Sequence, residues 1–321
     1  MSTSAREDRP GDTPLVEVDG IWAKLECTNP CGSIKDRIAE YILRESEARG
    51  LLRPGTRIVE ATSGNTGIAF AYYAKKRGYA ITIVMPENMT EERKQMVRSL
   101  GADLILCSAE GSFAEAARIR DGLAREHGWF NPDQFSNPLN VECHDQTTGR
   151  EILLQVLRQV GRPIGAFVAG VGTGGTLIGV GRRLRGEFPA VRVVAVEPAE
   201  SAVMSGGRAG LHTIQGIGDG FIPAIAGDGG GGVNALIDDV EVVSSDEAKA
   251  AAVRLAEVHG FCVGISSGAN LVAAQRAARR VEGVVVTVFP DGYAKYQSQG
   301  LRHCATGRCR FEHDPVVAPR V

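Results

Sequence analysis

The segment RIVEATSGNTG, residues 57–67, contains the pattern that decides the fold. Its first six residues include three β-branched side chains and predict a strand, and the glycine-containing turn that follows leads into an apolar helix through Lys76. The same order repeats twice, with strand-like runs at 81–86 and 103–107 and helix-like runs at 91–100 and 113–127. Strands that alternate with helices predict parallel sheets with crossover helices.

A second series of the same kind occupies the rest of the chain, beyond a turn-rich boundary near residues 130–150. We therefore predict an α/β fold of two lobes, each with a parallel-rich twisted sheet flanked by helices. In the second series the predicted strands are 166–171, 192–198, 239–244 and 284–290, and the predicted helices are 175–185, 246–259 and 269–281.

The composition is that of an ordinary folded protein of 321 residues, with 43% apolar and 23% charged residues. The net charge of −2 gives no electrostatic case for nucleic acid or an anionic membrane as a partner. No apolar run approaches the roughly 20 residues that span a bilayer. The polar N-terminus and the odd count of 7 cysteines predict reduced thiols in the cytoplasm rather than secretion.

Lys35 lies at a predicted helix start, where lysine is unusual. Residues 29–37 read NPCGSIKDR, so a proline- and glycine-containing turn brings Lys35 to the first turn of a helix. The positive end of the helix dipole and partial burial lower the pKa of an amine and make it a better nucleophile. Lys35 is therefore either a reactive lysine or a solvated lysine at a capped helix start.

Residues 62–67, TSGNTG, follow a predicted strand and precede a predicted helix. Backbone N–H groups and hydroxyls at a helix N-terminus bind anions. The side chains of Thr62, Ser63 and Thr66 suit a carboxylate, and Asn65 can donate to a phenolate-like oxygen. The alternative is a helix N-cap with spare hydroxyls.

Two further glycine-containing turns complete the candidate site. Residues 172–176, GTGGT, follow the strand predicted at 166–171 and indicate a phosphate-binding loop. They lack the Walker lysine and the full Rossmann spacing, which disfavours a nucleoside triphosphate or a dinucleotide. Residues 264–268, GISSG, open a helix, where Ser266 and Ser267 are either N-caps or hydroxyl partners for a heterocyclic nitrogen.

A reactive lysine, a carboxylate loop, a phosphate loop and a neutral hydroxyl together favour pyridoxal phosphate acting on an amino acid. With these four motifs in this order, the chain resembles the family of cysteine synthases (O-acetylserine sulfhydrylases) and cystathionine β-synthases, in fold type II of the pyridoxal phosphate enzymes. The resemblance runs from about Thr13 to Tyr296. It includes residues 134–138 (QFSNP), 146–149 (QTTG), 197–198 (EP) and 214–218 (IQGIG).

The resemblance implies a role for each matching residue. Lys35 would be the catalytic residue and would bind pyridoxal 5'-phosphate covalently. Asn65 would contact the ring hydroxyl and Ser266 the pyridine nitrogen. The phosphate would be bound by Gly172, Thr173, Gly174, Gly175 and Thr176, and the substrate by Thr62, Ser63, Gly64, Thr66, Gln134 and Gly216.

The resemblance also implies the reaction, a β-replacement on an activated serine such as O-acetylserine, through an aminoacrylate intermediate. Lys35 would remove the α proton, the leaving group would depart, and a small nucleophile would add to give cysteine or another β-substituted alanine. A hydroxyl at the ring nitrogen suits β-elimination better than transamination, because it makes a weaker electron sink than a carboxylate. The rivals are a serine/threonine dehydratase-type lyase and a non-catalytic, pyridoxal phosphate-binding regulatory partner. Residues 215–218 and the paired serines favour the first function.

The organisation implied by the resemblance is that of the tryptophan synthase β-like fold. Residues 12–37 plus 142–300 would form a larger cofactor-binding domain. Residues 38–141 would form a smaller, mobile domain that closes on the substrate carboxylate, with tails at 1–11 and 301–321. The partners would be a small amino-acid substrate, a small nucleophile and a second copy of the chain in a homodimer.

The chain departs from the family pattern at positions that bear on the second substrate. Asp219 stands where a small apolar residue is common, Cys31 stands where alanine is common, and residues 289–293 read FPDGY instead of containing Pro-Asp-Ser-Gly. An ionised Asp219 near the pocket would repel an anionic nucleophile such as hydrosulfide. Aspartate is also common in turns, so Asp219 either lies near the pocket or faces solvent or caps a turn.

The C-terminal segment carries His303, Cys304, Cys309 and His313. Their spacing matches none of the standard zinc patterns, so no metal site is predicted.

Overall fold

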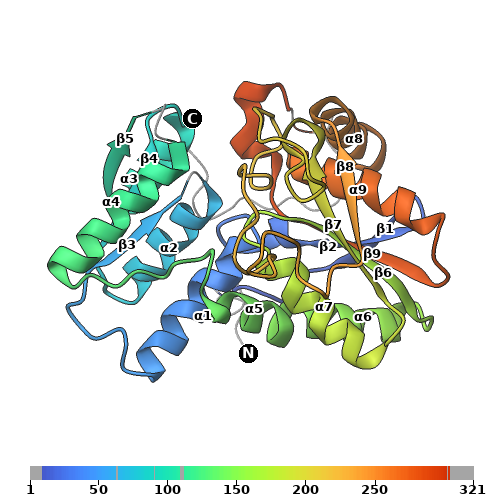
Figure 1. The fold of residues 1–321 in the computed structure, drawn as a ribbon, viewed down its shortest axis with the longest axis horizontal. Coiled ribbons are helices and arrows are strands. Elements are labelled where there is room, and N and C mark those ends of the chain that lie inside the picture. The colour runs from blue at the N-terminus through green and yellow to red at the C-terminus, as the bar shows by residue number, and fades with distance from the viewer. Residues whose placement is uncertain (1–8, 63, 90, 109–111, 302, 304–321) are drawn as a thin grey trace.

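The computed structural model describes residues 9–62, 64–89, 91–108, 112–301 and 303, which form two α/β lobes (Figure 1). The predicted fold class is confirmed. The strands are β1 (Leu15–Val18), β2 (Ile21–Leu25), β3 (Ile58–Ala61), β4 (Ile81–Pro86), β5 (Asp103–Cys107), β6 (Ile164–Gly170), β7 (Arg192–Pro198), β8 (Asp239–Val243) and β9 (Val284–Phe289). The α-helices are α1 (Lys35–Ala48), α2 (Asn65–Lys76), α3 (Glu91–Ser99), α4 (Ser112–His127), α5 (Pro138–His144), α6 (Arg150–Gln159), α7 (Gly175–Glu187), α8 (Ser245–His259) and α9 (Ile265–Ala278).

The larger lobe is built on a sheet with the strand order β1-β2-β9-β6-β7-β8. All neighbouring strands are parallel except β1, which pairs antiparallel with β2 in a tight hairpin. Apolar side chains of α8 and α9 belong to one core cluster of this sheet, and those of α6 and α7 belong to another. The strands from β9 to β7 are therefore rich in β-branched residues, as expected where both faces of a parallel sheet are covered.

The smaller lobe is built on a parallel sheet with the order β3-β4-β5. Side chains of α1, α2 and α3 pack in one apolar cluster with Ile58 and Ile83, and α4 packs in another with Val59 and Val84. In Figure 1 this lobe lies beside the larger one, with α1 and α5 beneath the junction. β3 and β6 each belong to the parallel part of their own sheet. The loops at their carboxyl ends contain residues 62–67 and 172–176 and lie between the lobes.

Local sequence explains where the helices begin and end. A capping box formed by Ser244 and Glu247 starts α8, and Gly260, with a φ of +71°, ends it. The expected start of α9 at residue 269 was four residues late, because the helix begins at Ile265 directly after Gly264. Ser266 and Ser267 therefore lie inside the first turn, and the interpretation of them as N-caps was wrong.

The segment from α5 to α6 is one nearly continuous helical stretch that the strand and helix pattern did not predict. Between the two helices, residues Asp145–Gly149 form a π-helical turn. Gly149 lies against Arg183 of α7, where a Cβ would come within 2.9 Å of the arginine Cβ. The absence of a side chain on Gly149 therefore lets the π turn lie directly against α7.

A buried group of four charges, which we call the Arg37 cluster, ties β2, α1 and α6 together. It consists of Lys24, Glu26, Arg37 and Glu151. Arg37 binds Glu26 through Nε (2.6 Å) and Glu151 through Nη1 (2.7 Å), and Lys24 Nζ lies 2.7 Å from Glu151. Two cations face two anions, so the cluster carries no net charge.

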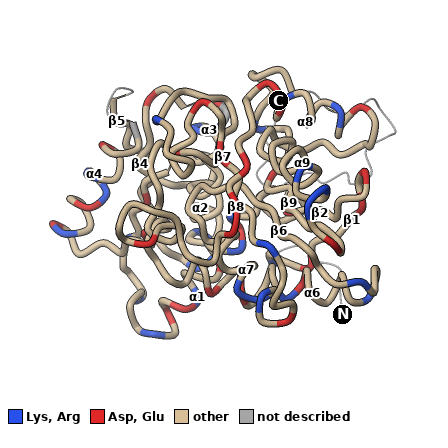
Figure 2. Tube along the Cα trace, turned by 45° about the vertical axis from the view of Figure 1, so that its right-hand side comes forward, with Lys and Arg blue, Asp and Glu red and all other residues tan. Residues whose placement is uncertain are grey.

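Figure 2 shows basic and acidic residues interspersed along both lobes. Within the described part of the chain, no helix is both long and apolar enough to cross a membrane.

Candidate active site

Two adjoining cavities lie where the loops of the two lobes meet, with empty volumes of about 510 and 530 Å³. We call them the outer and the inner cavity. Both are lined by Lys35, Asn65, Gly172, Thr173 and Gly216, so they meet around the lysine. The outer cavity is also lined by Thr62, Gly64, Thr66, Arg93, Phe113, Gln134, Phe135, Asp219 and Tyr296, and the inner one by Gly174, Thr176, Gln215, Ser266 and Asp291.

Lys35 is the first residue of α1, as predicted, and it is held there by a rigid turn. The Ile34 N–H donates to the Pro290 carbonyl at 2.8 Å, and the Cys31 N–H donates to the buried Asp36 carboxylate at 2.7 Å. The cap position is Ile34, which offers no side-chain hydrogen bond. The reading of Lys35 as a solvated lysine at a capped helix start was therefore wrong.

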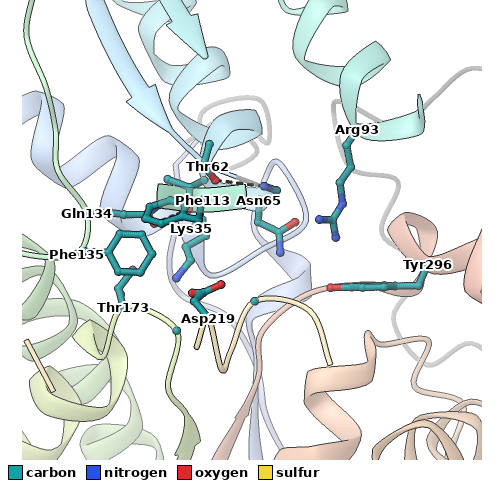
Figure 3. A pocket seen from close by; sticks show the side chains of 14 residues that line it. Lys35, Thr62, Asn65, Arg93, Phe113, Gln134, Phe135, Thr173, Asp219 and Tyr296 are labelled. Atoms are coloured by element: carbon teal, nitrogen blue, oxygen red, sulfur yellow. Dashed lines mark hydrogen bonds between the residues drawn. The ribbon is translucent and has the colours of Figure 1, made fainter. Parts of the chain in front are cut away.

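The surroundings of Lys35 favour its neutral amine. Burial lowers the pKa of Lys35, and the carboxylates of Asp219 and Asp291 oppose this shift without cancelling it. Lys35 Nζ makes no hydrogen bond or ion pair with any residue that the structure describes. Figure 3 shows the amine directed into the cavity beside the Asp219 carboxylate. A half-buried amine with a lowered pKa can act as a nucleophile and as a base.

The Asn65 amide is held in one orientation by a buried carboxylate. Its Nδ2 donates to Asp291 Oδ2 at 2.8 Å, and Tyr296 Oη donates to the same oxygen at 2.6 Å. Asn65 Oδ1 and Asp291 Oδ1 are buried, and neither has a hydrogen-bond partner among the described residues. Nδ2 makes one hydrogen bond to the described residues, so its second proton remains available to a ligand oxygen in the cavity.

The loop at the start of α2 is shaped by a glycine rather than by a hydroxyl cap. Gly64 is the N-cap residue, and no side chain caps the helix, so the N-cap reading of this motif was wrong. The Thr66 hydroxyl donates instead to Gln134 Oε1 at 2.7 Å, across to the segment before α5. A Cβ on Gly64 would lie 2.8 Å from Arg93 Nη1. Ser63 lies outside the described residues.

The loop at the start of α7 is a backbone cradle that requires glycine. Gly174 has a φ of +85°, and a Cβ there would lie 2.8 Å from Ala226 Cβ. A Cβ on Gly172 would lie 2.2 Å from the Gly216 carbonyl oxygen. Gly175 is buried beneath the loop against the Asn140 side chain and is not among the residues that line either cavity. The loop thus directs the N-terminus of a 13-residue helix at the inner cavity.

A buried histidine supports this loop from below. His144 Nε2 lies 3.2 Å from Thr176 Oγ1, and His144 Nδ1 lies 2.9 Å from Thr148 Oγ1 in the π turn. Burial, with a smaller contribution from Lys35, holds the pKa of His144 well below its usual value of 6.5. The imidazole is therefore neutral at physiological pH.

Ser266 lines the inner cavity and is 4% exposed. It reaches the cavity from the first turn of α9, which follows α8 rather than a strand. This motif therefore differs from residues 62–67 and 172–176, which follow strands. Except for Ser63, which is not described, and Gly175, every site residue predicted from the sequence lines one of the two cavities.

Sequence reasoning missed the side chains that close the outer cavity. Arg93 comes from a charged helix that resembles a solvated surface, yet it is 4% exposed and its Cζ lies 5.7 Å from the centre of the Tyr296 ring. Phe113 and Phe135 have ring centres 4.7 Å apart. Asp219 lines the outer cavity, so the structure supports its location near the pocket. No local pattern identified the other four, because they are brought together only by the fold.

Among the described residues, no three His, Cys, Asp or Glu side chains are grouped so that they could hold a metal ion. Cys304, Cys309 and His313 lie outside those residues.

The chain matches a known protein family over most of its length. Residues 7–291 match the family model described as pyridoxal-phosphate dependent enzyme. A cysteine synthase of Staphylococcus aureus is 43% identical over 302 residues, which cover 91% of this chain and 94% of that protein.

Two solved structures show the same fold over nearly their full length. One is a variant of a hydrogen sulfide-producing enzyme of Fusobacterium nucleatum, complexed with an alpha-aminoacrylate intermediate; it has a TM-score of 0.86 and 36% identity, over 98% of this chain and 95% of that chain. The other is an O-acetylserine dependent cystathionine beta-synthase of Helicobacter pylori, with a TM-score of 0.85 and 35% identity over 94% of this chain and 99% of that chain.

Proposed function

Because the chain belongs to the family of pyridoxal-phosphate dependent enzymes, we infer that it is an enzyme that uses this cofactor for β-replacement on an amino acid. One observation carries this function. Lys35 lies where two cavities meet, between an anion-binding loop of each lobe. The similarity to a cysteine synthase and to an O-acetylserine dependent enzyme favours β-replacement over a dehydratase or a non-catalytic partner.

The residues present fit pyridoxal phosphate. Gly172 and Gly174 pack too closely against Gly216 and Ala226 to carry a side chain, so the loop presents only backbone and the N-terminus of α7 to the inner cavity, as a phosphate requires. Asn65 offers an amide proton and a buried oxygen without a partner, which suits the ring hydroxyl. Lys35 would hold the cofactor, the 172–176 loop its phosphate, and Ser266 its ring nitrogen. When bound, the cofactor supplies an electron sink for the pair left on the α carbon as its proton departs.

Lys35 would also move the α proton. Its lowered pKa leaves more of the amine unprotonated near neutral pH than in an ordinary lysine, so it can accept that proton. The resulting ammonium would return a proton to the same carbon at the end of the cycle. Asp219 and Asp291 stabilise the ammonium while the proton is held.

The outer cavity would bind the amino-acid substrate. We propose that its carboxylate is bound by Thr62, Ser63, Gly64 and Thr66 at the start of α2, where N–H groups and hydroxyls meet an anion. Gln134, whose Oε1 accepts the Thr66 hydroxyl proton, would also contact the substrate carboxylate. Gly216 would line the space for the substrate side chain.

The substrate of the first half of the reaction is proposed to be an activated serine such as O-acetylserine. The O-acetylserine dependent structural relative supports this choice. Addition of a small nucleophile would then give cysteine or another β-substituted alanine.

We further propose that residues 38–141 move as a smaller domain against a larger one of residues 12–37 plus 142–300, with 1–11 and 301–321 as tails. The supporting observation is that the substrate loop belongs to one lobe and the 172–176 loop to the other, so that a bound ligand favours closure. Small-angle scattering with and without a bound amino acid should show a smaller radius of gyration in the complex.

The chain is also proposed to act as a homodimer in the cytoplasm. Among the described residues, Cys27, Cys31 and Cys143 are unoxidised thiols, which supports a reducing compartment. The family resemblance supports the dimer, and sedimentation equilibrium would test it by the mass in solution.

The function is tested by separating the two halves of the reaction. The enzyme with pyridoxal phosphate is mixed with O-acetylserine, and released acetate is measured before sulfide or another nucleophile is added and the product is identified by mass. We expect one acetate per active site without a nucleophile and a β-substituted alanine with one. Continuous release of pyruvate and ammonia, with no substituted product, would instead identify a dehydratase.

A further inference from the structure

Asp219 is held in the outer cavity by a well-anchored loop. The preceding residue, Gly218, has a φ of +70°, and its N–H donates to the Val171 carbonyl at 3.0 Å. The Gly218 carbonyl accepts from Ser201 Oγ at 3.1 Å and lies 2.9 Å from His212 Nε2. The backbone on the N-terminal side of Asp219 is thus tied to Val171, directly after β6, and to two side chains, which fixes where the Asp219 side chain enters the cavity.

The Asp219 carboxylate faces the reacting lysine and is not neutralised by an ion pair. It makes no hydrogen bond or ion pair with any described residue, and it is accessible to the solvent of the cavity. Figure 3 shows it beside the Lys35 amine. The protein around the cavity desolvates it and raises its pKa, while Lys35 and His212 oppose this shift. The carboxylate is therefore a proton acceptor with open space in front of it.

Two aromatic rings line the outer cavity together with this carboxylate, and a third ring packs against them. Phe113 and Phe135 line the outer cavity, and Phe221 lies two residues after Asp219. The ring centre of Phe221 is 6.2 Å from that of Phe113 and 5.5 Å from that of Phe135. An apolar wall strengthens the field of the nearby carboxylate and favours a nucleophile with an organic body over a small hydrated anion.

We propose that Asp219 selects an uncharged or cationic nucleophile, such as an organic thiol or amine, and accepts its proton as it adds to the substrate. This inference rests on the proposed β-replacement. Like charges repel across the cavity, so hydrosulfide and other anions are disfavoured. A nucleophile that arrives with its proton needs a base, and Asp219 is placed to be that base.

The step balances for a thiol. In the first half-reaction, acetate leaves with its bonding pair and the substrate is left with a double bond between its α and β carbons. The sulfur lone pair then forms the bond to the β carbon, and the S–H proton passes to Asp219. The double-bond pair moves toward the α carbon, where the Lys35 ammonium delivers its proton. Asp219 releases its proton to the cavity solvent, so the net products are the S-substituted cysteine, acetate and one proton.

The test uses three thiols of similar size that differ in charge: thioglycolate, 2-mercaptoethanol and cysteamine. The holoenzyme is first mixed with O-acetylserine, and the rate of the second half-reaction is then measured with each thiol for wild type, Asp219→Asn and Asp219→Ala. Comparing each thiol between wild type and variant removes the effect of its own pKa. The exposed Glu257→Gln on α8 is the control for a lost surface carboxylate.

We expect wild type to prefer cysteamine and 2-mercaptoethanol to thioglycolate, and both variants to reduce this preference by about tenfold, an amount typical of one close charge. The variants should also slow the reaction with 2-mercaptoethanol by a larger factor than they slow acetate release. As a readout independent of turnover, the pH midpoint of the bound cofactor's absorbance should fall, because the Asp219 carboxylate lies beside the Lys35 nitrogen and would stabilise a positive charge there.

Two results would overturn the proposal. An unchanged ranking of the three thiols in both variants would show that Asp219 does not select the nucleophile. An equal slowing of both half-reactions would make Asp219 only a counter-ion for Lys35. Failure of the β-replacement function is a separate result, since wild type would then form no S-substituted cysteine with any of the three thiols.

Discussion

Lys35 and Arg37 lie two residues apart on α1, yet the charge of Arg37 is fully paired and that of Lys35 is not. Arg37 is 2% exposed, and each of its nitrogens binds Glu26 or Glu151. Lys35 faces open cavity and has no direct partner among the described residues, although Asp219 and Asp291 lie near enough to raise its pKa.

The difference separates a structural charge from a reactive one. In the Arg37 cluster, two cations and two anions satisfy one another, so the charges fix the relative positions of β2, α1 and α6. Around Lys35 the protein leaves the amine and two carboxylates incompletely paired, which keeps them free to exchange protons. The same helix turn thus has one face that holds the fold together and one that does chemistry.

Replacing Lys35 should produce the largest loss of activity and no loss of stability. Lys35→Ala should lower turnover of O-acetylserine by at least about 10³-fold, because it removes the proton-transfer group. It should not lower the free energy of unfolding of the apoprotein, measured with urea, because no hydrogen bond or ion pair of the described chain is lost.

Lys295 provides the matched control for Lys35. It is also buried with a lowered pKa, but it donates to the carbonyls of Cys31 and Gly32 at 3.3 Å. Borohydride reduction followed by peptide mass spectrometry should place the cofactor on Lys35 in both wild type and Lys295→Met. A reduced adduct that persists in Lys35→Ala would contradict the assignment.

Replacing Arg37 should lower the stability of the fold. Arg37→Met leaves Glu26 and Glu151 with only Lys24 to balance them, and breaking a buried pair costs about 3–5 kcal/mol in the free energy of unfolding. The folded fraction should keep the wild-type preference among nucleophiles. Arg44→Ala, an exposed arginine on the same helix, should cost less than about 1 kcal/mol. Equal losses in the two variants would show that burial of the cluster does not matter.

The pH dependence of stability should follow the Arg37 cluster. Its cations hold the pKa of Glu151 at about 2, below the ordinary value of 4.5. Ionised Glu151 therefore stabilises the fold above pH 4.5, and this contribution, about 3 kcal/mol, is lost as the pH falls toward 2. Urea unfolding at pH 5 and pH 3 should show a smaller difference for Glu151→Gln than for wild type. An identical slope would mean that other carboxylates dominate acid unfolding.

The smallest effect is expected from Asp291→Asn, which removes a charge near Lys35 but keeps a hydrogen-bond acceptor in its place. The new amide oxygen can still accept from Asn65 and Tyr296, so cofactor affinity should fall by less than about tenfold, the value of one hydrogen bond. The lost charge should move the pH midpoint of the bound cofactor's absorbance downward, because a nearby carboxylate stabilises a positive charge on the Lys35 nitrogen. No shift with Asp291→Asn would show that this carboxylate does not act on the lysine.

Periodicity in the sequence predicted much of the fold. The bounds predicted for β4, β5 and β7 match the structure, because each of these strands is a continuous run between turn residues. The β1-β2 hairpin was missed although Asp19-Gly20, both with positive φ, is a strong signal for a two-residue turn. The π turn was missed because nothing in the pattern of residues 145–149 distinguishes it from an ordinary helix.

The residues of the candidate site also divide into those that a local motif predicted and those that only the fold brings together. Lys35, Asn65 and the 172–176 loop were found from short motifs because neighbouring residues make each of them. The wall of Phe113 and Phe135 and the contact of Arg93 with Tyr296 join segments far apart in the chain. The Arg37 cluster was likewise invisible, since Glu151 lies 114 residues from Arg37. Such pairings depend on tertiary packing and leave no local pattern.

The neutral imidazole of His144 carries one ring proton and has two hydroxyl neighbours. If Thr176 donates its hydroxyl proton to a phosphate oxygen, its oxygen must accept from His144, which then carries the proton on Nε2. Nδ1 in turn accepts the hydroxyl proton of Thr148 in the π turn. A phosphate that accepts from Thr176 would thus select one tautomer of His144, and the π turn lies at the far end of this chain of hydrogen bonds.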